Sequence, residues 1–276
     1  MVQALQPSNL IVPLMKQFMA DDVDTRDHTE ITMSSLGHCA RQLAYRKHGK
    51  LGEPLTWRAI GIFEDGDYHH YQIRKTMSDA LQYRDKEGKI IGAHCFQLVD
   101  QEVEVELCGI KGHLDGVLKH DSTSCKDPLH TDMVLEVKSM NERSYKEAVK
   151  NQELSWPYAC QVSAYLAAKG LTSALIVLKN KNTSEIAEFI FQMDPELVVS
   201  RVSMVDKINK SSRPEDIDRE FMPKKSGALP WQCNYCEFVF DCYQPYGIER
   251  VKDKKHRVDI AKWYVDFPPT KGKEGV

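Results

Sequence analysis

The chain has 276 residues, of which 42% are hydrophobic and 28% are charged, which is typical of one large globular domain or two small ones. No apolar run is long enough to cross a bilayer, and the N-terminal residues lack the pattern of a signal peptide, so we expect a cytoplasmic protein without a membrane partner. The formal net charge of −3 is not that of a general nucleic-acid-binding protein, so any such contact must come from a local basic surface.

The N-terminal part of the chain predicts helices. Ser8–Ala20 carries apolar residues on one helical face, and a second helix begins near Cys39 behind serines that can cap it. A longer helix is predicted over Trp57–Ser78, and it carries the adjacent residues His69 and His70. A histidine in a helix is more often a satisfied core or surface residue than a ligand, and only one of these two can face a given site.

Strand patterns follow the helices. The segments Lys89–Leu98, Glu102–Cys108 and Ile110–Leu118 alternate or are apolar, and a polar surface loop separates them from a further strand at Met133–Lys138. Alternation places His113 and Asp115 on one face of their strand. It likewise places Glu136 and Lys138 on one face of theirs, with the intervening apolar residues directed toward the core: Leu114, Leu135 and Val137.

If these two strands pair, Asp115, Glu136 and Lys138 converge. Two adjacent carboxylates repel each other and need a cation between them, and a hard divalent ion such as Mg²⁺ or Mn²⁺ suits oxygen ligands. A lysine beside the ion can orient water and offset negative charge that develops on a phosphate. This is the chemistry of phosphodiester hydrolysis, although an acid-x-lysine pattern alone is usually a solvated strand face.

A helix is predicted from Ser155, which is followed by proline in the first turn, to Gly170. Gln161 and Tyr165 are four residues apart and share a face of that helix, as does Tyr158. They form either a partly buried polar stripe or a pair that holds a phosphate or steadies the lysine. Two further strands and a helix complete a mixed sheet with flanking helices: Ala174–Lys179, Glu185–Gln192 and Pro195–Lys210.

The cysteines provide a second signal. Cys233, Cys236 and Cys242 have the spacing of metal ligands, and Cys39 is the residue chosen as the fourth ligand. In a reducing compartment the eight cysteines are not expected to form a disulfide framework. Cys125 lies in the polar loop and is the weakest competitor for the fourth position. The other cysteines are expected to be small core residues: Cys95, Cys108 and Cys160.

Together these motifs resemble the PD-(D/E)XK nuclease superfamily, and in particular its RecB-like branch with an iron–sulfur cluster. That branch includes AddB-type nuclease domains, nucleases of CRISPR adaptation and phage exonucleases. The resemblance covers about three quarters of the chain, from Cys39 to Cys242. Its motifs occur in the order of the family: Cys39; Gly66 with His70; Gly112 with Asp115; Glu136 with Lys138; Gln161 with Tyr165; and Cys233, Cys236 and Cys242.

The resemblance implies a role for each residue. His70, Asp115, Glu136 and the carbonyl group of Val137 would bind Mg²⁺ or Mn²⁺, and Lys138 would position the attacking water. Gln161 and Tyr165 would contact DNA or support the lysine, with His113 as an accessory residue and His69 as the alternative to His70. The four cysteines would hold a 4Fe–4S cluster, although their spacing does not separate this from zinc.

We therefore expect an α/β fold of the restriction-endonuclease type, built as a single domain. Its predicted parts are a helical region over residues 1–85, a nuclease core over 86–212, a cluster-binding segment over 213–248 and a charged tail over 249–276, which is expected to be frayed where it ends in Pro268–Lys273. The expected activity is a metal-dependent exonuclease acting on DNA with free ends, in the cytoplasm of a bacterium or of a phage-infected host. A single-strand annealing protein or another recombination protein is an expected partner, and the sequence leaves the oligomeric state open.

Two other classes of function remain as alternatives. One is a non-catalytic nucleic-acid-binding or CRISPR-adaptation assembly protein that keeps the fold, but the intact Asp115, Glu136 and Lys138 argue against it. The other is a redox sensor or electron carrier built around the cysteine site, which leaves those three residues unexplained. The absence of a Gly-x-x-x-x-Gly-Lys-Ser/Thr motif favours a free-standing nuclease without a helicase domain.

Overall fold

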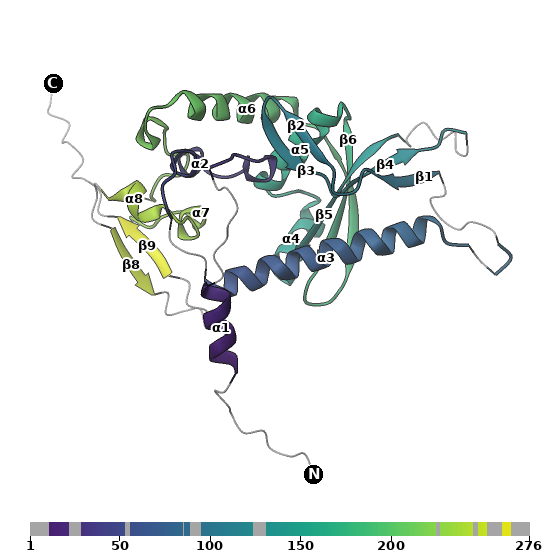
Figure 1. The fold of residues 1–276 in the computed structure, drawn as a ribbon, viewed down its shortest axis with the longest axis horizontal. Helices are drawn as coiled ribbons and strands as arrows, with labels where there is room; N and C mark the ends of the chain where they lie inside the picture. The colour runs from purple at the N-terminus through teal and green to yellow at the C-terminus, as the bar shows by residue number, and fades with distance from the viewer. Residues whose placement is uncertain are drawn as a thin grey trace, which may run out of the picture.

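The computed structural model describes residues 11–21, 29–52, 56–84, 86–88, 95–123, 131–224, 227–244, 248–252 and 261–265. These residues form a mixed sheet flanked by helices, with a smaller helical and two-stranded region at one end (Figure 1). None of the helices in these ranges combines the length and apolar character needed to cross a membrane. Cys125 lies outside the described residues, as do Ser8–Leu10 at the start of the first predicted helix.

The central sheet has five strands in the order β1-β4-β5-β6-β7. β5 and β6 are parallel and the other neighbours are antiparallel. Parallel neighbours need a crossover, and the helices α4 and α5 provide it between β5 and β6. The bounds are β1 Phe96–Val99, β4 Gly116–His120, β5 Met133–Met140, α4 Glu142–Asn151, α5 Trp156–Lys169, β6 Ser173–Asn180 and β7 Ile186–Gln192.

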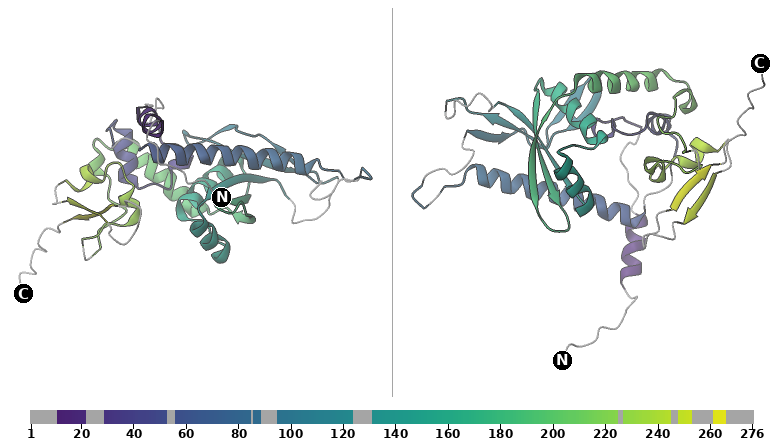
Figure 2. Two further views of the ribbon diagram at one scale, coloured as in Figure 1. Left: turned by 90° about the horizontal axis from the view of Figure 1, so that it is seen from below. Right: turned by 180° about the vertical axis from the view of Figure 1, so that it is seen from behind.

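The strand β5 lies at the centre of the sheet and is covered on both faces. Leu135 and Val137 pack with Ile73 of the long helix α3 (Trp57–Leu81), whereas Val134 belongs to the larger core that includes α5. The view from below shows α3 lying across the sheet (Figure 2). Leu135 and Val137 thus pack in the core as predicted, and Glu136 and Lys138, which pair with each other, are buried as well.

The predicted continuous strand Ile110–Leu118 is divided between two sheets. β3 (Ile110–His113) forms a separate hairpin with β2 (Glu104–Leu107), and β4 then joins the main sheet. Cys108 and Gly109 both have positive φ, as a tight two-residue hairpin turn requires, so Cys108 is exposed and not the core residue that was predicted.

The chain bends between β3 and β4, and this bend places the first carboxylate. The β2–β3 register ends at Glu104 and His113, and the N–H of Leu114 then donates to the carbonyl oxygen of Val103. Side-chain alternation does not continue through the bend, so His113 is exposed while Asp115 is buried. The prediction that these two residues share a face is therefore wrong.

Further helices pack outside α5. α6 (Pro195–Lys210) lies against α5, and α2 (Ala40–Lys47) packs on α6, with the short helix η1 (Met33–Ser35) against α5. α1 (Val12–Asp21) contacts the start of α3. The C-terminal region contains η2 (Pro214–Asp216), α7 (Trp231–Asn234) and α8 (Val239–Tyr243).

The charged tail predicted over 249–276 contains a paired hairpin, and its predicted frayed end, Pro268–Lys273, lies outside the described residues. β8 (Ile248–Lys252) and β9 (Ala261–Val265) form an antiparallel two-stranded sheet beside α7, as Figure 1 shows. β-branched and aromatic residues supply the strand propensity in both segments. The high charge of this region therefore did not prevent strand pairing.

Candidate active site

Asp115 lies at the bend where β4 enters the main sheet. The β4–β5 register begins at Gly116 and Leu135, so Asp115 stands at the end of that ladder, beside the part of β5 that β4 does not pair. Its Oδ2 accepts a hydrogen bond of 2.7 Å from the N–H of Val137. The carboxylate thus takes the place of a strand neighbour and is anchored to the backbone of β5.

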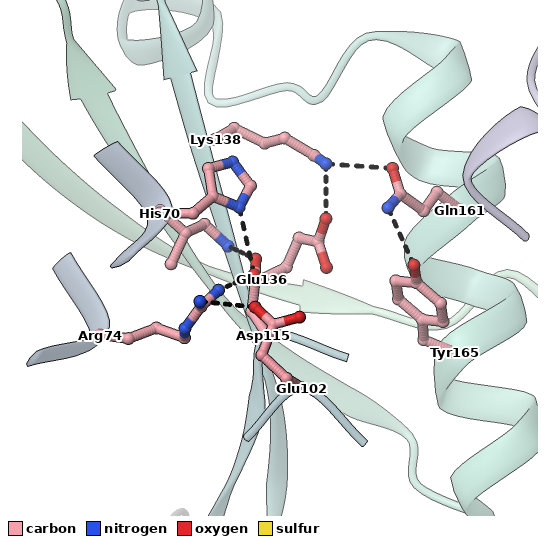
Figure 3. A network of polar contacts seen from close by, with 9 residues as sticks. His70, Arg74, Glu102, Asp115, Glu136, Lys138, Gln161 and Tyr165 are labelled. Atoms are coloured by element: carbon pink, nitrogen blue, oxygen red, sulfur yellow. Dashed lines mark hydrogen bonds and ion pairs between the residues drawn. The ribbon is translucent and has the colours of Figure 1, made fainter. Parts of the chain in front are cut away.

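Two residues of α3 reach Asp115 from the other side of the site. His70 and Arg74 are four residues apart and therefore share a helical face. Nδ1 of His70 lies 3.1 Å from Oδ1 of Asp115, and a guanidinium nitrogen of Arg74 donates to the same oxygen at 2.7 Å. The second terminal nitrogen of Arg74 contacts Glu102 at 2.5 Å. Figure 3 shows this network.

A second line of contacts runs from β5 to α5. Nζ of Lys138 lies 2.6 Å from Oε1 of Glu136 and donates to Oε1 of Gln161 at 3.0 Å. Gln161 in turn donates to the hydroxyl oxygen of Tyr165 at 3.1 Å (Figure 3). Nζ of Lys138 also lies 4.8 Å from the centre of the Tyr158 ring. The polar face of α5, formed by Tyr158, Gln161 and Tyr165, therefore positions the side chain of Lys138.

Burial and charge set the protonation of this site. Burial opposes the ionisation of Asp115, but His70, the N–H of Val137 and the charge of Lys138 together outweigh it and lower the pKa of that carboxyl group. Burial raises the pKa of Glu136, and the charge of Asp115 adds to this effect. Burial also opposes the charge of Lys138, but Glu136 outweighs it and raises the pKa, so Lys138 stays a cation near neutral pH.

The structure separates the two adjacent histidines. His70 contacts Asp115, whereas His69 is placed near Lys179 and Lys181, and burial together with their charges lowers its pKa. The side chain of His113 is exposed, whereas Asp115 and Glu136 are buried.

Sequence reasoning missed Arg74 and Glu102. The spacing of Arg74 from His70 is a signal that could have drawn attention to it, because residues four apart on a helix point the same way. No comparable signal exists for Glu102. Its position depends on the bend before Asp115, where the N–H of Glu102 donates to the carbonyl oxygen of Leu114.

The donor set suits a hard divalent ion, but in this arrangement protein cations neutralise the carboxylates. Asp115 pairs with His70 and Arg74, and Glu136 pairs with Lys138. Within the described ranges, no group of three or more His, Cys, Asp or Glu side chains has the geometry to hold a metal ion. Coordination by these carboxylates therefore requires that some of these internal contacts be exchanged.

The four predicted cysteine ligands line one pocket at the other end of the molecule. They come from the start of α2 and from the α7–α8 segment, and Arg41, Tyr45 and Arg219 lie around the same pocket. Nε of Arg219 lies 3.3 Å from the sulfur atom of Cys242. Burial, and the proximity of Cys39 and Cys242, raise the pKa of Cys233 to about 12, so a cation is needed to hold these thiols as thiolates.

An ion pair between a buried arginine and a more exposed glutamate holds the backbone on both sides of Cys39. Arg201 of α6 donates to the carbonyl oxygen of His38 at 2.7 Å and pairs with Glu220 at 2.6 Å. Glu220 accepts the N–H of Ala40 at 2.8 Å. The side chain of Arg201 is only 4% exposed, so this pair fixes the position of Cys39 at the start of α2.

No family model and no curated protein matches this sequence. Among solved structures, SSO0001 aligns with 16% identity over 85% of this chain and 96% of its own, at a TM-score of 0.43. The alkaline exonuclease LHK-Exo from Laribacter hongkongensis, in complex with dAMP, has 11% identity over 66% of this chain and 89% of its own, also at 0.43. A phage-related exonuclease from Haemophilus somnus has 14% identity over 66% and 93%, at a TM-score of 0.30.

Proposed function

We propose that this chain is a metal-dependent nuclease that hydrolyses phosphodiester bonds of DNA from free ends. The observation that carries the proposal is the meeting of Asp115, Glu136 and Lys138 at one buried site, joined by His70 from α3. Two buried carboxylates beside a lysine and a histidine have little structural benefit, because each charge must be desolvated. Such clusters of perturbed groups are typical of functional sites.

Each residue has a distinct role in this proposal. Asp115, Glu136, His70 and the Val137 carbonyl group would hold Mg²⁺ or Mn²⁺, which supplies Lewis-acid activation of the phosphate and of the attacking water. Lys138 remains protonated, so it acts as a donor that orients water and offsets charge on the phosphate, not as the base. Gln161 and Tyr165 keep the ammonium group of Lys138 in place.

The test is digestion of end-labelled DNA with Mg²⁺ or Mn²⁺. Linear and covalently closed circular DNA, each single- and double-stranded, should be compared with the wild-type protein and with Asp115→Asn and Glu136→Gln. We expect cleavage of linear DNA only, with loss of activity in both variants and in EDTA. Cleavage of closed single-stranded circles would show an endonuclease, and DNA binding without cleavage under every condition would favour the non-catalytic alternative.

We further propose that Cys39, Cys233, Cys236 and Cys242 hold a 4Fe–4S cluster with a structural role. Four cysteines that line one pocket support a four-thiolate site, and the Arg219 guanidinium beside Cys242 compensates part of its negative charge. Hydrolysis transfers no electrons, so the cluster would tie the N-terminal region to the C-terminal segment. Iron, sulfide and zinc analysis of protein purified without oxygen, together with the visible spectrum, distinguishes the cluster from a zinc site.

A further inference from the structure

Arg74 links two carboxylates that belong to different parts of the fold. It projects from α3 one turn beyond His70, and its side chain is only 11% exposed. One terminal nitrogen lies 2.7 Å from Asp115 and the other lies 2.5 Å from Glu102, whose side chain is 57% exposed. The guanidinium group therefore contacts both the buried active-site carboxylate and a second, more exposed carboxylate, and Figure 3 shows these contacts.

Hydrogen-bond donors of the protein contact both oxygens of Asp115. Arg74 and His70 share Oδ1, and the N–H of Val137 occupies Oδ2. On the neighbouring carboxylate, Lys138 lies 2.6 Å from Glu136. The positive charge that a divalent ion would bring to this pair is thus supplied by side chains.

Arg74 cannot give up its charge to make room for an ion. A guanidinium group stays protonated at any pH at which the protein is folded, so an ion that reaches Asp115 meets a fixed positive charge. The repulsion is relieved if the guanidinium group leaves Oδ1. A second carboxylate is already in contact with it, because the backbone of Glu102 is tied to Leu114, the residue directly before Asp115.

We propose that Arg74 is a cationic placeholder that competes with the divalent ion for Asp115, and that Glu102 retains the guanidinium group when the ion binds. This inference rests on the metal site of the proposed function. Arg74 then keeps the buried carboxylates neutralised in the metal-free protein and sets the ion concentration at which the site loads. It is a positioning residue, since it acts through Asp115 and not on the substrate.

The experiment measures Mn²⁺ binding to the full-length protein by the electron paramagnetic resonance signal of free Mn²⁺. The variants are Arg74→Gln, Glu102→Gln, the double variant, and Lys75→Gln as a control on an exposed neighbour of the same helix. Removing one charged hydrogen bond that opposes the ion should tighten Mn²⁺ binding of Arg74→Gln by about tenfold. Glu102→Gln leaves Arg74 entirely on Asp115 and should weaken binding.

The double variant should match Arg74→Gln, because Glu102 acts only through the guanidinium group, and Lys75→Gln should match the wild type. In EDTA, Arg74→Gln should melt below the wild type, and Mn²⁺ should raise its melting temperature by more. Weaker or unchanged Mn²⁺ binding in Arg74→Gln would overturn the placeholder role. Unchanged Mn²⁺ binding in Glu102→Gln would overturn it as well, and this variant alters an exposed residue and does not threaten folding. A wild-type protein that binds no Mn²⁺ would overturn the metal site itself and this inference with it.

Discussion

Replacing Lys138 by methionine should make the metal-free protein unstable and dependent on a divalent ion. The ammonium group pairs with Glu136 at 2.6 Å, and that carboxylate is only 2% exposed. Methionine fills a similar volume but supplies no charge and no donor. Glu136 is then left in the core beside Asp115 without its cation.

The size of the effect follows from the burial of the pair. Removing one partner of a buried ion pair costs about 3–5 kcal/mol, because the other charge stays desolvated. For a domain of this size, 1 kcal/mol corresponds to about 2–4 °C in melting temperature, so the expected loss is about 10 °C. Changing both partners, as in Glu136→Gln with Lys138→Met, should recover most of the loss, since no unpaired charge remains.

The loss should also depend on pH. The folded protein raises the pKa of Glu136 through burial and the charge of Asp115, and without Lys138 that pKa rises further. A group whose pKa is raised by folding destabilises the folded state as the pH rises through the folded pKa, because the unfolded chain loses its proton first. The deficit of Lys138→Met should therefore be small at about pH 5 and largest at about pH 8.

Thermal unfolding in EDTA and in Mn²⁺, at both pH values, measures these effects. Mn²⁺ should raise the melting temperature of Lys138→Met by more than that of the wild type, while cleavage of linear DNA is lost. Lys150→Met, on the exposed face of α4, is the matched control and should change neither property. Wild-type stability of Lys138→Met in EDTA at the higher pH would refute the account of the Glu136 environment, and wild-type cleavage would refute the role of the lysine.

Three further outcomes are expected. Cys39→Ala should lose the visible colour and the iron of the purified protein, whereas Cys160→Ala should keep both, and the reverse result would show that the fourth ligand is misassigned. His70→Ala should weaken Mn²⁺ binding more than His69→Ala in the same titration, because only His70 contacts the site. Arg201→Met should lower the iron content, and it should cost about 1–3 kcal/mol of stability for each of the two carbonyl groups that lose their donor. Iron analysis and thermal unfolding measure these effects, and full iron content would show that the pair of Arg201 and Glu220 does not position Cys39.

Local patterns in the sequence were sufficient for features that lie within one element. Gln161 and Tyr165 share a helical face wherever the helix lies in the fold, because they are four residues apart. The hydrogen bond between them follows from this spacing. The boundaries of α5 follow in the same way from Pro157 near its start and Gly170, which adopts a left-handed conformation, at its end. The alternation of β5 likewise predicted a strand at Met133–Lys138.

The tertiary structure decided how these elements meet. Asp115 reaches β5 because the chain bends after β3. The sequence carries no periodic pattern that marks this bend, since the alternation of side chains within a strand says nothing about where one strand ends and the next begins. Arg74 and Glu102 join the site from a helix and a turn that only the packing of α3 brings together. The periodicity of a sequence shows which side of a helix or strand is apolar. Which neighbouring element covers that side is determined by the packing of the core, because core packing depends on contacts between residues far apart in the chain.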